Sequence, residues 1–271
     1  QHVVPQFRIP REAVEKDVRF IEDHGVEFEF GADPAKLNVE SLKKQGYDYI
    51  FLGIGAEKDK DIGVEGKDER VLESLQFLRK YRRDPSSVSL GEKVVVVGGG
   101  DVAMDCAQAC ARVSGVKDVT VLYRRAEKQM PADAEEYEAA LESGAEFRFL
   151  RNPEKLDADG TLTVRVMRLG EKDARGRARP EATDEVETMK VDNVITAIGQ
   201  DVDSEYLKAF GISVDGRGNP KVDEESLETE VENVYIGGDA QTGASSIIAG
   251  VAGGKRAAES ITRKESPNWN P

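Results

Sequence analysis

A run of valines that ends in three glycines constrains the fold more than any other feature of this chain. Residues 94–107 read VVVVGGGDVAMDCA. A short β-branched run predicts a buried strand, and the residues after the glycines have the apolar spacing of a helix. A strand that passes through a glycine turn directly into a helix is typical of parallel α/β sheets. The stretch therefore predicts one unit of such a sheet.

The rest of the chain repeats this alternation of strands and helices. We expect strands at 26–30, 47–57, 93–97, 118–123, 145–149, 192–198 and around 231–237, and helices at 11–25, 71–83, 100–113, 132–143 and within 245–261. The stretches TLTVRVMRL and VETMKV predict an antiparallel excursion after Arg151, around the charged loop 170–185. The fold class is therefore α/β with a doubly wound parallel sheet, and 271 residues are enough for two domains.

The glycine turn matches the dinucleotide-binding fingerprint G-x-G-x-x-G/A. Its residues are Gly98, Gly99, Gly100, Asp101, Val102 and Ala103. In such a turn the first glycine allows a tight bend, the second lets a pyrophosphate approach the backbone, and the small third residue lets helix and strand pack closely. The helix N-terminus offers free N–H groups to the phosphate. An ordinary strand-to-helix turn is the alternative, and the correctly spaced second strand favours the dinucleotide.

The end of that second strand bears on the choice of cofactor. NAD-binding units place an acid about 20 residues after the glycines, whereas an arginine there accommodates the 2′-phosphate of NADP. This chain has Tyr123, Arg124 and Arg125 at the strand end, and no acid. We therefore expect NADPH to be preferred over NADH, the alternative being that the two arginines are a solvated surface pair.

Composition limits the class of partner and the cellular compartment. With 38 Lys and Arg against 52 Asp and Glu, the net charge is −14, which argues against nucleic acid or an anionic membrane as the main partner. No apolar stretch approaches the ~20 residues that cross a bilayer. Two cysteines fit a reducing cytoplasm. The chain begins at Gln1 in what reads as the interior of a fold, so we expect it to be part of a longer protein.

Several other residues suggest chemistry but have simpler interpretations. Cys106 and Cys110 are four residues apart in the expected helix, where their β-carbons would lie about 5 to 6 Å apart, too far for a disulfide. Core packing is the better interpretation. Asp101 and Asp105 serve a helix N-terminus more readily than a metal. No metal site is expected, and neither His2 nor His24 has a ligand cluster around it.

Four segments together resemble a known family. They are VVVVGGGDVAMDCAQA, LYRRAEKQMPA, VITAIGQ and VYIGGDAQTGASSIIAGVAGGKRAA. They are similar to the small (beta) subunit of NADPH-dependent glutamate synthase and to the flavoprotein module of dihydropyrimidine dehydrogenase. VVPQFRIP and FRFLRNPEKLDADGTLTVRVMRLGE are most similar to the flavin-containing subunit of a selenate reductase.

The resemblance implies two Rossmann-like domains, with an NADPH domain inserted into an FAD domain. Residues 1–56 and 201–265 would be a partial FAD-binding domain, 57–200 the NADP(H)-binding domain and 266–271 a tail. It also implies a flavin contact for VVPQFRIP and cofactor roles for the following residues: Gly55, Gly199, Gln200, Gly238, Asp239, Ser245, Ser246 and Ile247. The family's first strand-GxGxxG-helix unit for FAD has no counterpart in these 271 residues, so we expect the FAD site to be incomplete.

Three functions are compatible with these patterns. The first is a cytoplasmic NADPH-dependent flavoprotein oxidoreductase module, which passes a hydride from NADPH to FAD and electrons to an iron–sulfur or other redox partner. No side chain need act as a catalytic acid or base there, because the cofactors carry the chemistry. The second is a disulfide reductase, which would need a C-x-x-C motif that the chain lacks. The third is a non-catalytic NADP(H)-binding or assembly module of a larger enzyme.

Overall fold

The computed structural model describes residues 3–172, 176 and 178–269, and its chain divides into two compact units. Unit 1 comprises Gln1–Val26 and Asp59–Gly199, and unit 2 comprises Glu27–Lys58 and Gln200–Pro271. Each unit is therefore built from two separate stretches of chain. The chain passes between them three times, and β2 (Lys58–Asp59) pairs with β11 (Gln200–Asp201) where two of these passages occur.

Unit 1 is built on a five-stranded sheet in the order β3-β10-β4-β5-β6, in which every neighbouring pair is parallel. The strands are β3 (Val71–Glu73), β4 (Lys93–Val97), β5 (Asp118–Tyr123), β6 (Glu146–Phe149) and β10 (Asn193–Thr196). Parallel strands aligned in this way place all their carboxyl ends at one edge, where α/β proteins bind ligands.

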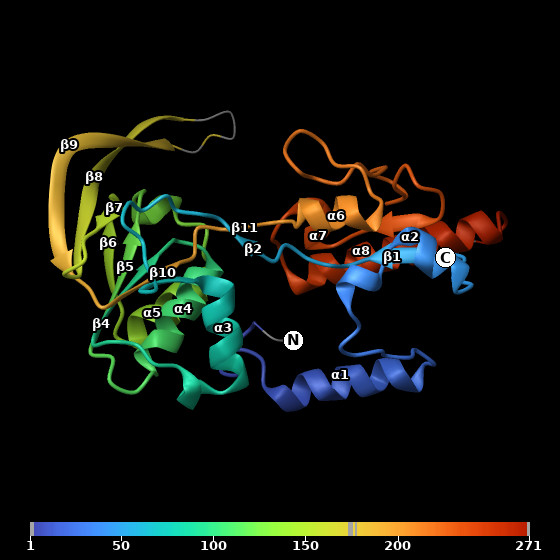
Figure 1. The fold of residues 1–271 in the computed structure, drawn as a ribbon, viewed down its shortest axis with the longest axis horizontal. Coiled ribbons are helices and arrows are strands. Elements are labelled where there is room, and N and C mark those ends of the chain that lie inside the picture. The colour runs from blue at the N-terminus through green and yellow to red at the C-terminus, as the bar shows by residue number, and fades with distance from the viewer. Residues whose placement is uncertain (1–2, 173–175, 177, 270–271) are drawn as a thin grey trace. The chain divides into compact units, whose positions relative to one another are not determined.

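Two layers cover the two faces of this sheet (Figure 1). One face packs against α3 (Ser74–Arg83), α4 (Asp101–Ala111) and α5 (Ala134–Glu142). The other packs against an antiparallel sheet of β7 (Arg151–Leu156), β8 (Thr161–Lys172) and β9 (Ala178–Lys190). Because successive side chains of a strand alternate, Val94 and Val96 face the helices and Val95 and Val97 face the antiparallel sheet. Both faces are buried, which explains the continuous valine run.

Residues 3–10 pack on unit 1, which differs from the expected assignment of residues 1–56 to the other domain. Val3 contacts the helix-side core, and the ring of Phe7 lies under the Arg112 guanidinium at 4.4 Å. Arg82 donates a hydrogen bond to the carbonyl of Ile9 at 2.7 Å. These contacts hold the segment that precedes α1 (Arg11–Asp23). They join the first 26 residues to the unit formed by Asp59–Gly199. His2 lies outside the described residues.

Unit 2 has a two-stranded parallel sheet of β1 (Ile50–Leu52) and β12 (Val234–Ile236), in which Ile50 pairs with Val234. Its helices are α2 (Val39–Lys44), α6 (Ser204–Phe210), α7 (Asp239–Thr242) and α8 (Ile247–Glu265), and short 3₁₀ turns occur at Pro34–Lys36 in this unit and at Pro85–Ser87 and Glu127–Gln129 in unit 1. Phe51, between the two buried residues of β1, is 42% exposed.

Two sequence predictions of secondary structure are wrong. Residues 26–30 form no strand and leave Phe28 and Phe30 exposed, because no described strand pairs with them. The predicted helix 71–83 begins only at Ser74, since Val71–Glu73 pairs with β10 at the edge of the sheet. The α/β fold and the antiparallel excursion are confirmed.

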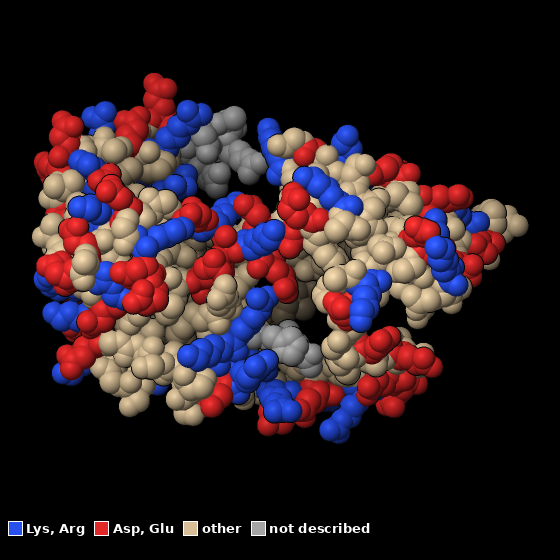
Figure 2. Space-filling view, viewed as in Figure 1, with Lys and Arg blue, Asp and Glu red and all other residues tan. Residues whose placement is uncertain are grey.

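Charges of both signs are interspersed over the surface (Figure 2). A group of Lys and Arg side chains gathers over α3, whose last turn carries Lys80, Arg82 and Arg83. Cations at a helix C-terminus complement the helix dipole, so Lys80, Arg82 and Arg83 stabilise the end of α3.

Candidate functional site

The glycine turn after β4 is held tightly by its neighbours at its first two positions. Gly98 has φ +148°, and a β-carbon there would lie 2.1 Å from the carbonyl oxygen of Ala197. A β-carbon on Gly99 would lie 2.6 Å from the ring of Tyr123. These two positions require glycine for packing alone. Ala103 is fully buried beside Gly98, as the small third residue of the fingerprint should be.

Gly100 is different, because no packing contact within the chain requires a glycine there. Its backbone is extended, with φ −103° and ψ 177°, and a β-carbon would meet nothing nearer than Pro131 Cγ at 3.9 Å. Gly100 is the N-cap of α4 and brings no side chain to cap the helix. The first N–H groups of α4 therefore have no side-chain cap, and a side chain at residue 100 would have room, so a phosphate could bind at this turn.

Asp101 and Val102 make contacts with other parts of the protein that hold this turn in place. The Asp101 carboxylate accepts a hydrogen bond from the backbone N–H of Asp133 at 2.9 Å. The N–H of Ala132 donates to the carbonyl of Gly99 at 3.1 Å. Val102 packs against the helix-side core. The sequence identified Asp101 and Val102 as cofactor-binding residues, and the structure gives both of them contacts within the fold.

The three residues at the end of β5 have three different environments. Tyr123 is buried, with its ring against Gly99 and its hydroxyl donating to the carbonyl of Gln129 at 2.7 Å. Arg125 is half-buried and donates from Nε to the carbonyl of Ala178 at 3.0 Å. Arg124 is exposed, and no contact joins its guanidinium group to another described residue. Of the two predicted phosphate ligands, Arg124 is the one free to meet a ligand.

The predicted flavin residues of unit 2 meet at one edge of its small sheet. Because β1 and β12 are parallel, the Gly55 turn and the turn at Gly238 lie at the same edge. Asp239 begins α7, and its carboxylate accepts the N–H of Ser245 at 3.1 Å. Ser246 caps α8 by accepting the N–H of Ala249 at 3.2 Å. Ile247, the first residue of α8, is 65% exposed.

The backbone of helix α8 passes close to the backbone of the turn at Gly238. A β-carbon on Gly253 would lie 3.0 Å from the backbone nitrogen of Gly238. A β-carbon on Gly238 would lie 3.6 Å from the α-carbon of Gly250. This close approach explains why the small residues of the sequence GVAGG occur in this helix. The N-terminus of α8 is therefore fixed beside Asp239.

Three glutamine side chains in the predicted cofactor segments have buried polar atoms without a partner. They are Oε1 of Gln129, Nε2 of Gln200 and Oε1 of Gln241, none of which has a hydrogen-bond partner among the described residues. Gln129 follows the arginine pair, Gln200 follows Gly199 (φ 113°), and Gln241 lies in α7. Buried polar atoms are normally hydrogen-bonded, so such groups fit a site that receives polar ligand atoms.

A partly buried pair of salt bridges near the glycine turn was not identified from the sequence. Arg8 Nη1 lies 3.2 Å from Asp105 Oδ1, and Arg8 Nη2 lies 2.6 Å from Glu136 Oε1. Asp105 is only 5% exposed, and burial raises the pKa of its carboxyl to about 6, although Arg8 acts in the opposite direction. The residues are distant in sequence, and only the apolar surroundings of Asp105 on α4 could have indicated that it is buried.

The two cysteines are part of the core, as predicted. Cys106 and Cys110 are free and fully buried among the residues between α4 and the sheet. Burial raises the pKa of both thiols, which suppresses the reactive thiolate form. The pair therefore lacks the access and the ionisation of a redox-active dithiol.

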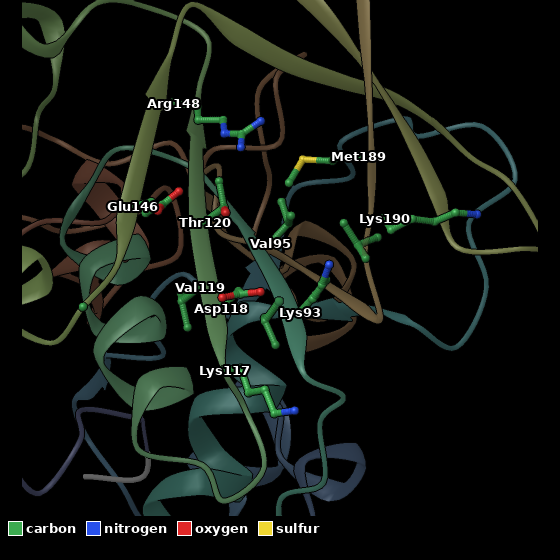
Figure 3. Close-up of a pocket in the computed structure, with 13 residues that line it drawn as sticks. Lys93, Val95, Lys117, Asp118, Val119, Thr120, Glu146, Arg148, Met189 and Lys190 are labelled. Atoms are coloured by element: carbon green, nitrogen blue, oxygen red, sulfur yellow. The ribbon is translucent and has the colours of Figure 1, made fainter.

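One cavity of about 330 Å³ lies away from the glycine turn (Figure 3). Its lining includes Lys93, Asp118 and Glu146, which begin β4, β5 and β6, so it lies at the edge of the sheet opposite the dinucleotide turn. The labelled lysine side chains do not converge on one point. This cavity is therefore not the predicted cofactor site.

Neither a metal centre nor a membrane-spanning helix occurs in the described part of the chain. Within 3–172, 176 and 178–269, no group of His, Cys, Asp and Glu side chains is arranged to hold a metal ion. In the same residues, no helix is both long and apolar enough to cross a membrane.

Known proteins resemble this chain over nearly all of its length. YgfK of Escherichia coli (strain K12), an oxidoreductase by name, is 48% identical over 266 residues, which are 98% of this chain and 26% of that protein. The NADPH-Fe(3+) oxidoreductase subunit beta of Geobacter sulfurreducens is 36% identical over 96% of this chain and 43% of its own length. The glutamate synthase [NADPH] small chain of Escherichia coli (strain K12) is 31% identical over 98% of this chain and 60% of its own length.

This chain thus spans between about a quarter and three fifths of these three relatives. Among solved structures, Mycobacterium tuberculosis FprA in complex with NADPH has the same fold, with a TM-score of 0.72 and 16% identity over 97% of this chain and 75% of that one. The sequence-family model of the pyridine nucleotide-disulphide oxidoreductases matches residues 3–256 of this chain. The chain belongs to the pyridine nucleotide-disulphide oxidoreductase family.

Proposed function

We propose that this chain is a module of an NADPH-dependent flavoprotein oxidoreductase, in which unit 1 binds NADP(H) and unit 2 contributes to an FAD site. The open space at Gly100 carries the proposal. Glycine is needed there by no contact within the chain, and the space lies at the uncapped N-terminus of α4. A pyrophosphate that approaches the backbone would account for both features.

NADP(H) would be held by the glycine turn and by the end of β5. The N–H groups at the start of α4 would meet the pyrophosphate, and Arg124 would meet the 2′-phosphate. Arg125 would contribute indirectly, because its hydrogen bond to the carbonyl of Ala178 keeps the loop after β5 in place. The names of the glutamate synthase small chain and the Geobacter subunit include NADPH, which supports this choice of nucleotide.

FAD would be held in part by unit 2. Gly55 and Gly238 leave the backbone accessible at the carboxyl ends of β1 and β12, and Asp239 presents a carboxylate to hydroxyl groups of a ligand. The N-terminus of α8, capped by Ser246 and followed by Ile247, would favour negative charge on a ligand. The amide groups of Gln200 and Gln241, which have atoms without a hydrogen-bond partner in the chain, would bond to polar atoms of the ligand. Bound FAD would accept the hydride of NADPH, and this chain's residues would orient the cofactors.

The electron acceptor and the partner subunits belong to the larger protein. The relatives are longer than this chain, and two of them are named as a subunit or a chain of an enzyme. An iron–sulfur or other redox partner in the cytoplasm is our expectation. The resemblance to a selenate reductase subunit stays a prediction, since the names of YgfK, the Geobacter subunit and the glutamate synthase small chain do not include selenate.

The alternative is a non-catalytic NADP(H)-binding or assembly module. The exposed side chains of Phe51, Ile247 and Ile248 in unit 2 favour it for this chain in isolation, because an apolar surface of this kind indicates that another segment or a ligand normally covers it. A disulfide reductase is not favoured, since both cysteines are buried.

Visible spectroscopy with calorimetry tests the proposal. The full chain is purified, its flavin spectrum is recorded before and after addition of FAD, and NADPH is then added without oxygen. Because we expect the FAD site to be incomplete, the chain should purify without flavin, and the expected results are NADPH binding and bleaching by NADPH of FAD added in excess. NADPH binding without bleaching of the added FAD would favour the assembly module. Absence of NADPH binding by calorimetry would contradict the assignment of unit 1.

A further inference from the structure

We propose that Arg8 is a positioning residue of the nucleotide site, because its guanidinium group links the second turn of α4 to the first turn of α5 and so keeps the 131–133 loop beside Gly99 and Gly100. The inference rests on the proposed binding of NADP(H) at the glycine turn. Arg8 belongs to the segment before α1 and is 97 residues from Asp105 in sequence. Its role is to hold two protein elements in place, and it need not touch the nucleotide.

Arg8 joins one carboxylate from each helix. Nη1 donates to Asp105 Oδ1 on α4 at 3.2 Å, and Nη2 lies 2.6 Å from Glu136 Oε1 on α5. The side chains of Asp105 and Glu136 are 8% and 18% exposed. Two partly buried carboxylates that face the same guanidinium would repel each other without it. Arg8 therefore converts a repulsion between α4 and α5 into an attraction.

A second contact between the same helices lies at the nucleotide site itself. Asp101, one turn before Asp105, accepts the N–H of Asp133, three residues before Glu136. Ala132, in the same loop, donates its N–H to the carbonyl of Gly99. Residues at i and i+3 or i+4 share a helix face, so the Arg8 bridge lies one turn below the Asp101 bridge. A separation of the helices at Asp105 would pull the 131–133 loop away from Gly99 and Gly100.

The N-terminal segment is built to deliver Arg8 to this position. The ring of Phe7 lies beneath the guanidinium of Arg112 at 4.4 Å and meets the ring of Tyr81 edge-on at 6.4 Å between centroids. Arg82 fixes the backbone on the other side of Arg8 through the carbonyl of Ile9. Two anchors that flank Arg8 already order the backbone there, so less backbone entropy is lost when the Arg8 side chain bridges the carboxylates.

The surroundings of Asp105 make the bridge sensitive to pH. Asp105 faces Arg8 from the N-terminal segment, Glu136 from α5, and Asp101 and the buried Cys106 thiol from its own helix. Burial raises the pKa of the Asp105 carboxyl to about 6 even with Arg8 present. Without Arg8 the pKa would rise further, because the positive charge that lowers it would be gone. Protonation of Asp105 would then remove the repulsion.

The test compares three variants of the full chain: Arg8→Gln, Arg8→Lys and the double variant Arg8→Gln/Asp105→Asn. We expect Arg8→Gln to raise the dissociation constant for NADPH about tenfold at pH 8, a usual size for coupling within one ion network. Arg8→Lys should retain most of the affinity. The double variant should recover it, because removal of the Asp105 charge leaves no pair of carboxylates to repel.

The pH profile separates positioning from a general loss of structure. The ratio of dissociation constants between Arg8→Gln and the parent chain should fall as the pH is lowered from 8 to 5.5, since Asp105 becomes protonated. Because both proteins are measured at each pH, the effect of NADPH's own titration on the dissociation constants cancels in the ratio. Affinity of Arg8→Gln within twofold of the parent chain, or a loss that neither acid nor Asp105→Asn relieves, would overturn the inference.

Amide hydrogen exchange tests the same bridge without any nucleotide. Arg8→Gln should speed exchange at Ala132 and Asp133, whose N–H groups bond to Gly99 and Asp101, and the double variant should restore their protection. Unchanged exchange at both amides would overturn the inference. If the parent chain failed to bind NADPH, the proposed function would fall, and the exchange rates alone would decide whether Arg8 positions the loop.

Discussion

Gly99 lies directly against the ring of Tyr123, where a β-carbon on residue 99 would come within 2.6 Å of the ring. At the next residue, Gly100, the nearest atom to such a β-carbon is 3.9 Å away. The two adjacent glycines of this turn therefore occur for different physical reasons. Gly99 is required by packing within the fold, and Gly100 is free for a ligand. This difference can be tested by substituting each in turn.

Gly100→Ser should leave the fold intact and abolish most NADPH binding. Serine is a favourable N-cap residue, and the extended backbone at this position suits any residue, so the free energy of unfolding should stay within about 0.5 kcal/mol of the parent value. The new β-carbon would occupy the space of the pyrophosphate, and we expect at least a tenfold (~1.4 kcal/mol) loss of affinity by calorimetry. Gly99→Ala is the matched variant, and it should lower the free energy of unfolding by about 1 to 3 kcal/mol. Equal NADPH affinity in Gly100→Ser and the parent chain would place the phosphate elsewhere.

Arg124→Ser should reduce the preference for NADPH over NADH. A hydrogen bond to a charged group contributes about 1.5 to 3 kcal/mol, so NADPH affinity should fall roughly ten- to a hundredfold. NADH affinity should hardly change, because NADH lacks the 2′-phosphate. Arg125→Ser is the comparison, since Arg125 already donates to Ala178 and its loss should weaken both nucleotides alike. Dissociation constants are measured at one ionic strength, because salt screens exposed charges. A constant NADPH to NADH ratio in Arg124→Ser would mean that the phosphate is recognised by other residues.

Asp105→Asn should remove a pH dependence of stability. Burial raises the pKa of Asp105 from 3.8 in the unfolded chain to about 6 in the folded one. The folded state therefore binds the proton more tightly, so the contribution is stabilising below pH 3.8 and is lost as the pH rises through 6. Between pH 7 and pH 4 the parent chain should gain up to ~3 kcal/mol relative to Asp105→Asn. Urea unfolding at each pH measures this difference, and parallel curves for the two proteins would contradict it.

Gly253→Ala should destabilise unit 2, and Gly250→Ala should not. The added methyl group at residue 253 would lie 3.0 Å from the backbone of Gly238, so α8 would have to move away from the turn that carries Asp239. We expect a loss of about 1 to 3 kcal/mol in the free energy of unfolding. At residue 250 the added methyl group meets nothing within 4 Å, and replacing a helical glycine should stabilise by about 0.5 to 1 kcal/mol. Thermal unfolding of the two variants distinguishes these outcomes, and a destabilised Gly250→Ala would show that α8 packs differently.

The local pattern of the sequence was sufficient to predict the strand, the helix and the core-facing residues at the centre of unit 1. The valine run is β4, the residues after the glycines are α4, and the stripe that contains Cys106 and Cys110 faces the core. These predictions succeed because both faces of a parallel strand and one face of its helix are buried, which leaves a strong apolar signal. The period of the pattern fixes the element without any knowledge of distant contacts.

Distant contacts explain what the sequence did not reveal. Nothing near Arg8 indicates that it meets Asp105 and Glu136, and nothing near Asp101 indicates that its carboxylate receives the N–H of Asp133. The alternation in residues 26–30 predicted a strand, but an isolated alternation cannot show whether a neighbouring strand exists to pair with it. The different roles of Arg124 and Arg125 likewise depend on where β9 begins.

The pairing of β1 with β12 has a consequence for synthesis on the ribosome. The strand of Ile50 cannot pair with β12 until Val234 has been synthesised, about 180 residues later in the chain. At translation rates of about 5 to 20 residues per second, this delay amounts to roughly 10 to 40 seconds. During that time Asp59–Gly199 emerges and can form the sheet of unit 1, while β1 and its Phe51 remain without their neighbour. Among the described residues, β1 thus waits for β12 longer than most domains take to fold, so the β1–β12 sheet of unit 2 forms after the sheet of unit 1 can form.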